Sequence, residues 1–279
     1  MNIREMTPAD ARRLYELAGL VGWNQTLEDC AFLINSPECR MICVEEGNEV
    51  IATAGAPVYD DVGFINMVIV KPEFRRRGIA TALVQHVLEI GREYRTFRLH
   101  ATPAGSCVYG KIGFVTTRTM SYFVAEPPKF APSPIKVEPV TAADLEELAA
   151  LDFRNCGLRR KFLFEDNLHR FGRFALKIAD GNGIAAFALG RRGRKQRQIA
   201  AVETRDGDWG KAFALIAAAS PMEKELPTNM ILFDADKDAV KRAEAGGFAK
   251  VRELIEMEYG VPGMPPGAGY HAIFGGDFG

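Results

Sequence analysis

The sequence predicts an α+β protein that contains two copies of one domain, each a mixed, mostly antiparallel sheet flanked by helices. The first observation is a repeated start. REMTPADARRLYELA near the N-terminus and VEPVTAADLEELAAL near the middle both read as a short strand followed by a helix. Thr7 and Asp10 in the first segment match Thr141 and Asp144 in the second, 134 residues later. A threonine followed three residues later by a carboxylate is a variant of the capping box, which satisfies amides in the first helical turn.

The second and third observations are further matches at this offset and a proline-rich break between the copies. Gly113-Phe114 recurs as Gly247-Phe248, and the strand-like INMVIV recurs as IAAVET. Five prolines lie between Ala125 and Pro139, and they exclude a continuous helix or a central strand there. We therefore expect domains at residues 1–125 and 135–260, a linker at 126–134, and a Gly/Pro-rich tail at 261–279. The tail is expected to be either extended over the surface, anchored by Tyr270 and Phe274, or partly disordered.

The elements of the first copy follow from the spacing of its apolar residues. Helical patterns cover about residues 8–18 and 27–34, and strand-like runs follow at MICVEE, EVIATAGAP and FINMVIV. Ile79, Leu83, Val87 and Ile90 recur at helical spacing and predict a helix over about residues 77–94 that buries them. A strand FRLHA, a short helix ending at YGKIG and a last strand over residues 114–124 complete the copy.

Composition indicates an ordinary globular protein. The 279 residues have a formal net charge of −1 and are 47% hydrophobic, so a dedicated nucleic-acid partner is not expected. No apolar run approaches the roughly 18 residues of a membrane span, and the first ten residues lack the apolar core of a signal peptide. The five cysteines form no C-x-x-C pair, which indicates neither a disulfide framework nor a metal site. We expect a cytoplasmic protein without a membrane partner, and the oligomeric state stays open.

The stretch VKPEFRRRGIATAL, Val70 to Leu83, joins an apolar strand to a helix through three arginines and a glycine. A helix N-terminus offers unpaired amides and the positive end of the helix dipole. Gly78 lets a ligand approach the backbone closely, and Arg75, Arg76 and Arg77 add positive charge. This arrangement predicts a phosphate cradle. The alternative is that the arginines only solvate a loop.

These residues resemble a known family. Arg75, Gly78 and Ala80 fit the R/Q-x-x-G-x-G/A signature of the GNAT superfamily of acyl-CoA-dependent N-acetyltransferases, and VYGKIGF resembles that family's Y-x-K-x-G-F ending. The resemblance covers about the first 125 residues. The duplicated layout, with GWNQT after the first helix, resembles tandem GNAT proteins whose second copy has degenerated.

The resemblance implies acetyl-CoA as cosubstrate and assigns roles to residues. The loop would bind the CoA pyrophosphate and the strand before it the pantetheine arm, through Val68, Ile69, Val70, Arg75, Arg76, Arg77, Gly78, Ile79, Ala80 and Thr81. Tyr109 stands where the family places the general acid that protonates the leaving thiolate. A backbone amide near Met67 or Val68 would polarise the thioester carbonyl. Trp23 and Asn24 follow the first helix, where this fold builds its acceptor site; the alternative for Trp23 is a place in the core.

The general base stays open. INMVIV has no carboxylate, although many family members have a glutamate on this strand. The candidates are His100 on the next strand, Asp60 and Asp61 in the preceding hairpin, or a chain of water molecules. The alternative for His100 is a structural histidine at a strand end. Cys107 is expected to be a packed thiol rather than a nucleophile.

The second copy lacks these residues. The offset of 134 places Trp209 at the position of Arg75, Ala212 at that of Gly78, and Ala243 at that of Tyr109. This copy is expected either to stabilise the first or to form one wall of an acceptor cleft between the domains. The basic run RRGRKQRQ, Arg191 to Gln198, is expected to be a solvated hairpin tip.

The resulting hypothesis is an enzyme that transfers acetyl from acetyl-CoA to a primary amine of a small-molecule acceptor, with the acceptor site between the domains. The alternative is a non-catalytic acyl-CoA sensor or interaction module. The sequence does not indicate which amine is the acceptor.

Overall fold

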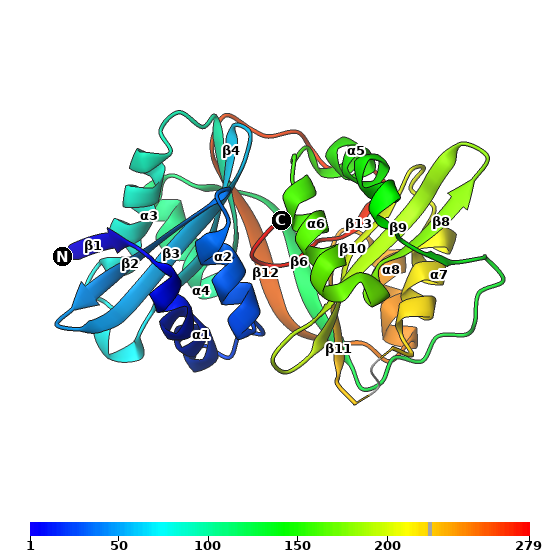
Figure 1. Cartoon of the computed structure of the whole chain (residues 1–279), viewed down its shortest axis with the longest axis horizontal. Coiled ribbons are helices and arrows are strands. Elements are labelled where there is room, and N and C mark those ends of the chain that lie inside the picture. The colour runs from blue at the N-terminus through cyan, green and yellow to red at the C-terminus, as the bar shows by residue number, and fades with distance from the viewer. Residues whose placement is uncertain (223–224) are drawn as a thin grey trace. The chain divides into compact units, whose positions relative to one another are not determined.

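A computed structural model describes residues 1–222 and 225–279. The chain forms two compact units, and neither is one continuous stretch of sequence. Unit 1 comprises Met1–Thr117, Ile255–Pro262 and Gly276–Gly279, whereas unit 2 comprises Arg118–Leu254 and Gly263–Gly275. Each unit is a mixed sheet with helices packed against it, which confirms the predicted α+β class (Figure 1).

Unit 1 contains a six-stranded arrangement in the order β1-β2-β3-β4-β5-β12. Neighbouring strands are antiparallel except for the parallel pair β4–β5. The elements are β1 (Asn2–Glu5), a 3-10 turn (Pro8–Asp10), α1 (Ala11–Leu20), α2 (Leu27–Asn35), β2 (Cys39–Glu46), β3 (Glu49–Tyr59), β4 (Val62–Val70), a 3-10 turn (Pro72–Phe74), α3 (Ile79–Ile90), β5 (Thr96–Ala101), α4 (Pro103–Ile112) and the last part of β12 (Ala249–Gly260).

Helix α3 covers one core of unit 1, and the α1–α2 pair lies on the other side of strands β2 and β3 (Figure 1). Ile79, Leu83 and Val87 are buried on α3, as the spacing predicts, and Ile90 is partly buried. The helix is shorter than predicted because it is capped at Gly78 and ends before Gly91.

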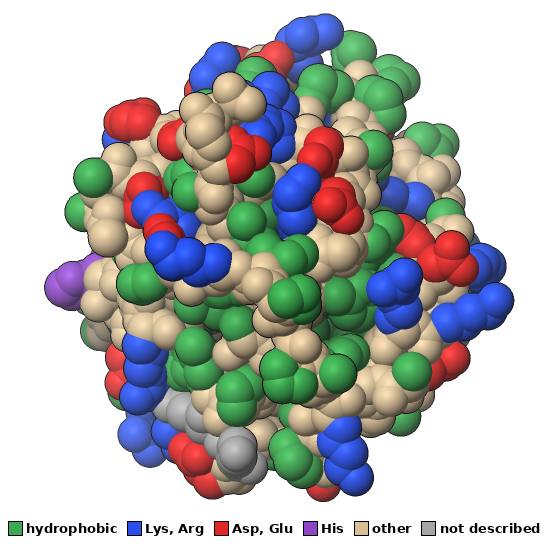
Figure 2. All heavy atoms as spheres, turned by 90° about the vertical axis from the view of Figure 1, so that its right-hand side faces the viewer, with side chains coloured by type: hydrophobic (Ala, Val, Ile, Leu, Met, Phe, Trp, Pro, Cys, Tyr) green, Lys and Arg blue, Asp and Glu red, His purple; other side chains and the backbone are tan. Residues whose placement is uncertain are grey.

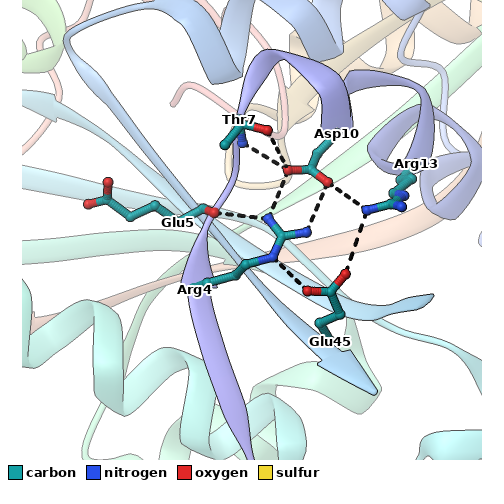
Figure 3. A network of polar contacts seen from close by, with 6 residues as sticks. All are labelled: Arg4, Glu5, Thr7, Asp10, Arg13 and Glu45. Atoms are coloured by element: carbon teal, nitrogen blue, oxygen red, sulfur yellow. Dashed lines mark hydrogen bonds and ion pairs between the residues drawn. The ribbon is translucent and has the colours of Figure 1, made fainter. Parts of the chain in front are cut away.

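A partly buried ion pair between Arg4 and the buried Asp10 holds the start of unit 1 (Figure 3). Asp10 accepts hydrogen bonds from Arg4 Nη1 at 2.8 Å, from Arg13 Nη1 at 3.0 Å and from the Thr7 amide at 2.9 Å. Arg4 also donates to Glu45 on β2 at 2.9 Å. The predicted capping box is present, and it is tied to the sheet through this arginine.

Unit 2 repeats the plan of unit 1 with one inserted strand. Its order is β6-β11-β13-β10-β9-β8-β7, and β10 and β11 are the parallel pair. The elements are β6 (Val115–Ala125), β7 (Glu138–Pro139), a 3-10 turn (Ala142–Asp144), α5 (Leu145–Cys156), α6 (Lys161–Phe171), a 3-10 turn (Gly172–Phe174), β8 (Leu176–Asp180), β9 (Gly183–Arg192), β10 (Arg197–Thr204), α7 (Trp209–Ala219), β11 (Thr228–Phe233), α8 (Lys237–Ala245) and β13 (Tyr270–Ala272).

The last strand of each sequence repeat pairs in the sheet of the other unit. In unit 1, residues 255–260 of β12 pair antiparallel with β5, from Ile255 opposite Ala101 to Gly260 opposite Thr96. In unit 2, residues 120–125 of β6 pair with β11. The compact units therefore follow strand pairing rather than the order of the repeats.

The Gly/Pro-rich tail contributes to both units. Residues 270–272 form β13, and Tyr270 and Phe274 are buried in unit 2. Residues 276–279 belong to unit 1, where Asp277 is buried. Of the two expectations for this tail, the extended one describes these residues, although they are buried rather than laid over the surface.

Candidate active site

The parallel strands β4 and β5 separate halfway along their length. They pair only from Val62 opposite Thr96 to Ile65 opposite Leu99. Met67 then adopts a left-handed backbone with φ of 48°, at a register shift between β3 and β4, and Thr53 Oγ1 donates to its carbonyl at 2.8 Å. Beyond this bulge, β4 continues to Val70 while it remains paired with β3. The other edge of Val68–Val70 therefore faces a gap between the strands, where an extended ligand can pair with the backbone.

The turn after β4 ends in a helix start suited to an anion. Gly78 is the N-cap of α3, with φ of 76°, and no side chain caps this helix. A Cβ built on Gly78 has no atom within 4 Å, so the space beside the N-cap residue is open. The first backbone bond of the helix runs from the Ala82 amide to the Gly78 carbonyl, which leaves the earlier amides available.

The three arginines surround this turn in different ways. Arg75 Nε donates to the Val70 carbonyl at 3.1 Å and so closes the turn. Arg76 is exposed and has a left-handed backbone with φ of 65°, while Arg77 lies 4.9 Å from the ring centre of Phe74. A groove of about 450 Å³ is lined by Arg77 and also by Glu45 and Glu46. Those carboxylates would repel a phosphate in the groove.

Tyr109 lies on α4 and is partly buried. Its ring packs edge-to-face on Phe114, with 6.0 Å between ring centres. Burial raises the pKa of its phenol to about 12, so the hydroxyl keeps its proton at neutral pH. Cys107, two residues earlier, is exposed. The expectation that this thiol is packed was wrong, because Cys107 lies on the solvent-exposed side of α4.

His100 lies on β5 and faces away from α3. Ile65 and Leu99 belong to the core under α3, so strand alternation places Asn66 and His100 on the opposite face. The His100 ring is fully buried, meets Phe64 edge-on at 5.0 Å between ring centres, and its Nε2 lies 3.3 Å from Glu256 Oε2. Among the described residues, Nδ1 has no hydrogen-bond partner. A neutral histidine with a proton on Nε2 presents Nδ1 as a base.

Glu256 was missed by the sequence reasoning. It lies on β12, 156 residues from His100 in the chain, and Thr117 Oγ1 donates to its Oε1 at 3.0 Å. No local pattern links the two residues, because the exchanged strand brings them together.

The loop between α1 and α2 reaches the same face of unit 1. The Trp23 amide donates to the Ala18 carbonyl at 2.9 Å, and Trp23 and Asn24 are both partly buried. The next residue, Gln25, is buried, and its side chain donates to the Asp277 carboxylate. Asn66, which precedes Met67, donates to the Asp277 carbonyl at 2.8 Å. Gln25, Asn66 and Asp277 were missed by the sequence reasoning, although Asn66 is the single polar residue of INMVIV.

The matching gap in unit 2 is filled by the chain itself. Strands β10 and β11 pair only at Arg197 and Gln198, and beyond this point β13 lies between them. Val202 of β10 and Leu232 of β11 both pair with Ala272. An extended segment of protein therefore occupies the place that is open between β4 and β5.

The helix start in unit 2 differs as well. Helix α7 begins at Trp209, which lies 130 residues after Ile79, the first residue of α3, so the turn is four residues shorter than the constant offset assumes. Its N-cap is Asp208, whose own carboxylate accepts from the Gly210 amide at 2.7 Å. The residues at the predicted positions of Gly78 and Tyr109, Ala212 and Ala243, are buried within helices. The Gly210 amide, at the start of α7, is thus already hydrogen-bonded to a carboxylate of the chain.

The basic run in unit 2 is only partly solvated. The turn between β9 and β10 contains the exposed Lys195, but Arg197 is buried and donates to the Ala219 carbonyl at 2.6 Å and the Ser220 carbonyl at 3.0 Å. The expectation of a solvated tip was wrong for Arg197, which caps the end of α7. On the face shown in Figure 2, basic and acidic side chains are interspersed.

Comparison with known proteins agrees with this geometry. The structure contains a split parallel strand pair and a glycine-capped helix within an α+β fold. Residues 9–114, less than half of the chain, match the family described as Acetyltransferase (GNAT) family. A comparison with curated proteins gives no significant match.

Three solved structures share the fold over nearly the whole chain. A proposed acetyltransferase from Pyrococcus horikoshii is 20% identical, with a TM-score of 0.81 over 100% of this chain and 95% of that one. A tandem GNAT protein from the clavulanic acid biosynthesis pathway is 13% identical, with a TM-score of 0.68 over 94% and 99%. A GCN5-related N-acetyltransferase from Sphaerobacter thermophilus is 16% identical, with a TM-score of 0.64 over 95% and 97%. The chain therefore has the tandem GNAT fold.

Two kinds of feature are absent from the described residues. Among residues 1–222 and 225–279, no helix is long and apolar enough to cross a membrane. Within the same ranges, no group of three or more His, Cys, Asp and Glu side chains is arranged to hold a metal ion.

Proposed function

We propose that unit 1 transfers an acetyl group from acetyl-CoA to a primary amine of a small molecule. The observation that carries this proposal is the contrast between the two units. The gap beside β4 is open and ends at an uncapped helix, whereas the gap beside β10 is filled by β13 and its helix is capped by Asp208. One chain would thus bind one CoA.

The residues of the turn fit the cosubstrate. The amides of Gly78, Ile79, Ala80 and Thr81 lie at the positive end of the α3 dipole, where no side chain caps the helix, and Arg75–Arg77 add positive charge. The free edge of Val68–Val70 offers backbone groups to the pantetheine arm. When bound, acetyl-CoA supplies a thioester whose carbonyl accepts the amine and whose thiolate leaves.

Two groups of unit 1 are suited to this chemistry. Met67 has a left-handed backbone at the bulge in β4, and an amide near Met67 or Val68 would stabilise negative charge on the carbonyl oxygen. Tyr109 holds its proton at neutral pH and would donate it to the leaving thiolate.

His100 is our candidate for the general base. The attacking amine must lose protons, and Nδ1 of His100 has no other partner among the described residues. Glu256 would hold the proton on Nε2 and leave Nδ1 as the acceptor. Asp60 and Asp61 are less suited, because they lie in the β3–β4 turn, at the end of β4 remote from the bulge.

The test combines binding and turnover on the full chain. Calorimetry with acetyl-CoA is expected to give one site per chain, and release of free CoA thiol is expected with at least one member of a panel of primary amines. Binding without thiol release would support an acyl-CoA sensor instead, and absence of binding would reject the proposal.

A further inference from the structure

The last residues of the tail form a fixed part of unit 1. Asn66 Nδ2 donates to the Asp277 carbonyl at 2.8 Å, and the Tyr59 hydroxyl donates to the Phe278 carbonyl at 3.0 Å. The Phe278 ring meets Phe32 of α2 with 6.4 Å between ring centres. Two buried side chains of the sheet thus hold consecutive carbonyls of the tail, so Asp277 is held in a defined place beside β4.

The side-chain amides of Gln25 and Asn66 have a hydrogen-bond partner for the NH₂ group but none for the oxygen among the described residues. Gln25 and Asn66 are each 5% exposed, and each uses its NH₂ group on Asp277. Within the described part of the chain, the side-chain oxygens of both residues have no hydrogen-bond partner. Gln25 donates to the Asp277 carboxylate and Asn66 to the Asp277 carbonyl, so each unpartnered oxygen lies one amide group away from Asp277. The Asn66 oxygen lies over Gly55 of β3, 2.8 Å from the position of a Cβ there. A buried acceptor without a donor is costly, which indicates that a ligand supplies the donors.

The chemistry of this cluster selects a particular ligand. It offers two amide oxygens and one carboxylate, which all accept hydrogen bonds and together carry a negative charge. A primary ammonium group has three N–H donors and a positive charge. It satisfies the amide oxygens and pairs with the carboxylate through charge-assisted bonds.

We propose that Gln25, Asn66 and Asp277 form the acceptor subsite of unit 1 and bind an aliphatic primary ammonium ion. This inference rests on the proposed acetyl transfer only for its biological role, because the binding itself is tested without turnover. Asn66 precedes the bulge residue Met67 in the chain, so the subsite adjoins the gap where the thioester is proposed to lie. The acceptor would therefore be a cationic amine rather than a neutral aromatic one.

The test uses side-chain amide NMR signals of the full-length chain labelled with ¹⁵N. The probes are n-butylammonium chloride, n-butanol as a neutral probe of the same size, and sodium and calcium chloride as cations without N–H donors. We expect the NH₂ signals of Gln25 and Asn66, assigned by their loss in single variants, to shift with n-butylammonium alone. Asn167 is an internal control: it is buried, donates to the Gly190 carbonyl at 3.0 Å and also has an unpartnered oxygen, but it lies in unit 2.

Variants then test the role of the charge. Asp277→Asn removes the charge and is expected to weaken n-butylammonium binding about 10-fold to 100-fold, as loss of a charge-assisted contact does. The exposed Asp238→Asn, on α8, is expected to bind as the wild type does. In turnover assays, Asp277→Asn should raise the KM for a cationic amine far more than it lowers kcat, with acetyl-CoA affinity unchanged.

Several results would overturn the subsite. These are equal shifts with n-butylammonium and n-butanol, equal shifts with the metal salts, shifts at Asn167 of the same size, or no shift at all. The comparison of probes on the wild type decides the matter even when Asp277→Asn does not fold. If n-butylammonium shifts Gln25 and Asn66 but no amine is acetylated, the subsite stands and the proposed reaction fails.

Discussion

Met67 and Ala201 lie 134 residues apart and share a left-handed backbone, with φ of 48° and 41°. Each lies at a register shift in the central strand of its unit, β4 or β10. Both halves thus share the bulge that separates the parallel strands. Beyond the bulge the halves differ, because unit 1 has an open gap and unit 2 has β13 in the same place.

Gly78→Glu is expected to abolish high-affinity acetyl-CoA binding. The new carboxylate would enter the open space at the start of α3, and like-charge repulsion should weaken binding about 100-fold or more. Isothermal titration calorimetry measures this loss. Retained affinity would show that the phosphates bind elsewhere.

Gly247→Glu is the matched control for this variant. Gly247 also has a left-handed backbone, with φ of 88°, and also has no atom within 4 Å of a Cβ. Both variants therefore carry a similar backbone cost, on the order of 1–2 kcal/mol. Gly247→Glu should still bind one acetyl-CoA per chain. Ala212 cannot serve as this control because it is fully buried in α7.

Tyr109→Phe is expected to lower kcat about 100-fold without changing acetyl-CoA affinity. The ring and its contact with Phe114 remain, so only the proton donor is lost. Steady-state kinetics and calorimetry together check this. A variant as active as the wild type would remove Tyr109 from the mechanism.

The raised pKa of Tyr109 also predicts a pH dependence. An acid acts only while it holds its proton, which is below its pKa of about 12. Loss of the Tyr109 proton should therefore not reduce kcat anywhere below about pH 11. A fall in kcat below that pH that is absent from the residual activity of Tyr109→Phe would contradict the assignment.

Glu256→Gln is expected to reduce kcat about 10-fold, because the amide no longer holds His100 Nε2 as the carboxylate does. His100→Asn should reduce kcat further, because the proposed proton acceptor is lost. Glu258→Gln is the matched control: it lies on the same strand and pairs with Arg98 at 2.7 Å. It should lower thermal stability and leave kcat unchanged. A kcat equal to that of the wild type in all three variants would mean that His100 is structural.

Asp10→Asn is expected to destabilise the protein by about 1–3 kcal/mol at pH 7, because it removes a buried charged acceptor of Arg4. The hydrogen bonds from Arg4 hold the pKa of Asp10 well below its usual range. Such a group stabilises the folded state above its unfolded pKa of about 3.9, and that stabilisation is lost as pH falls further. Urea unfolding should thus show that the difference in free energy of unfolding between wild type and variant becomes smaller from pH 5 to pH 2. If this difference does not change with pH, lost packing rather than lost charge explains the destabilisation.

Local features of this fold could be predicted from the sequence. The capping threonines Thr7 and Thr141 and the apolar face of α3 each depend on residues a few positions apart. The glycine turn before α3 could also be predicted, and Gly78 is the N-cap of that helix. Anion binding at this turn stays a prediction.

Non-local features could not be predicted. The constant offset misplaced the start of α7 by four residues, because a shortened turn leaves no mark in apolar periodicity. Strand β12 can pair with β5 only because the chain returns to unit 1 after residue 254, and pairing partners are not encoded in either strand alone. For the same reason Glu256 and Asp277 could not be linked to His100 and Asn66.

The pairing of β5 with β12 sets the order in which the protein can be completed during translation. Residue 101 ends β5, yet its partner Ile255 leaves the ribosome only about 150 residues later. At about 5–20 residues per second, β5 waits on the order of ten to thirty seconds for its neighbour. During that interval the nascent sheet ends in an unpaired edge, which β6 is free to cover before β11 is made. Most of unit 1 is thus synthesised first, but its sheet is complete only after β12 has been made. Its proposed acceptor subsite is complete only after Asp277 has been added.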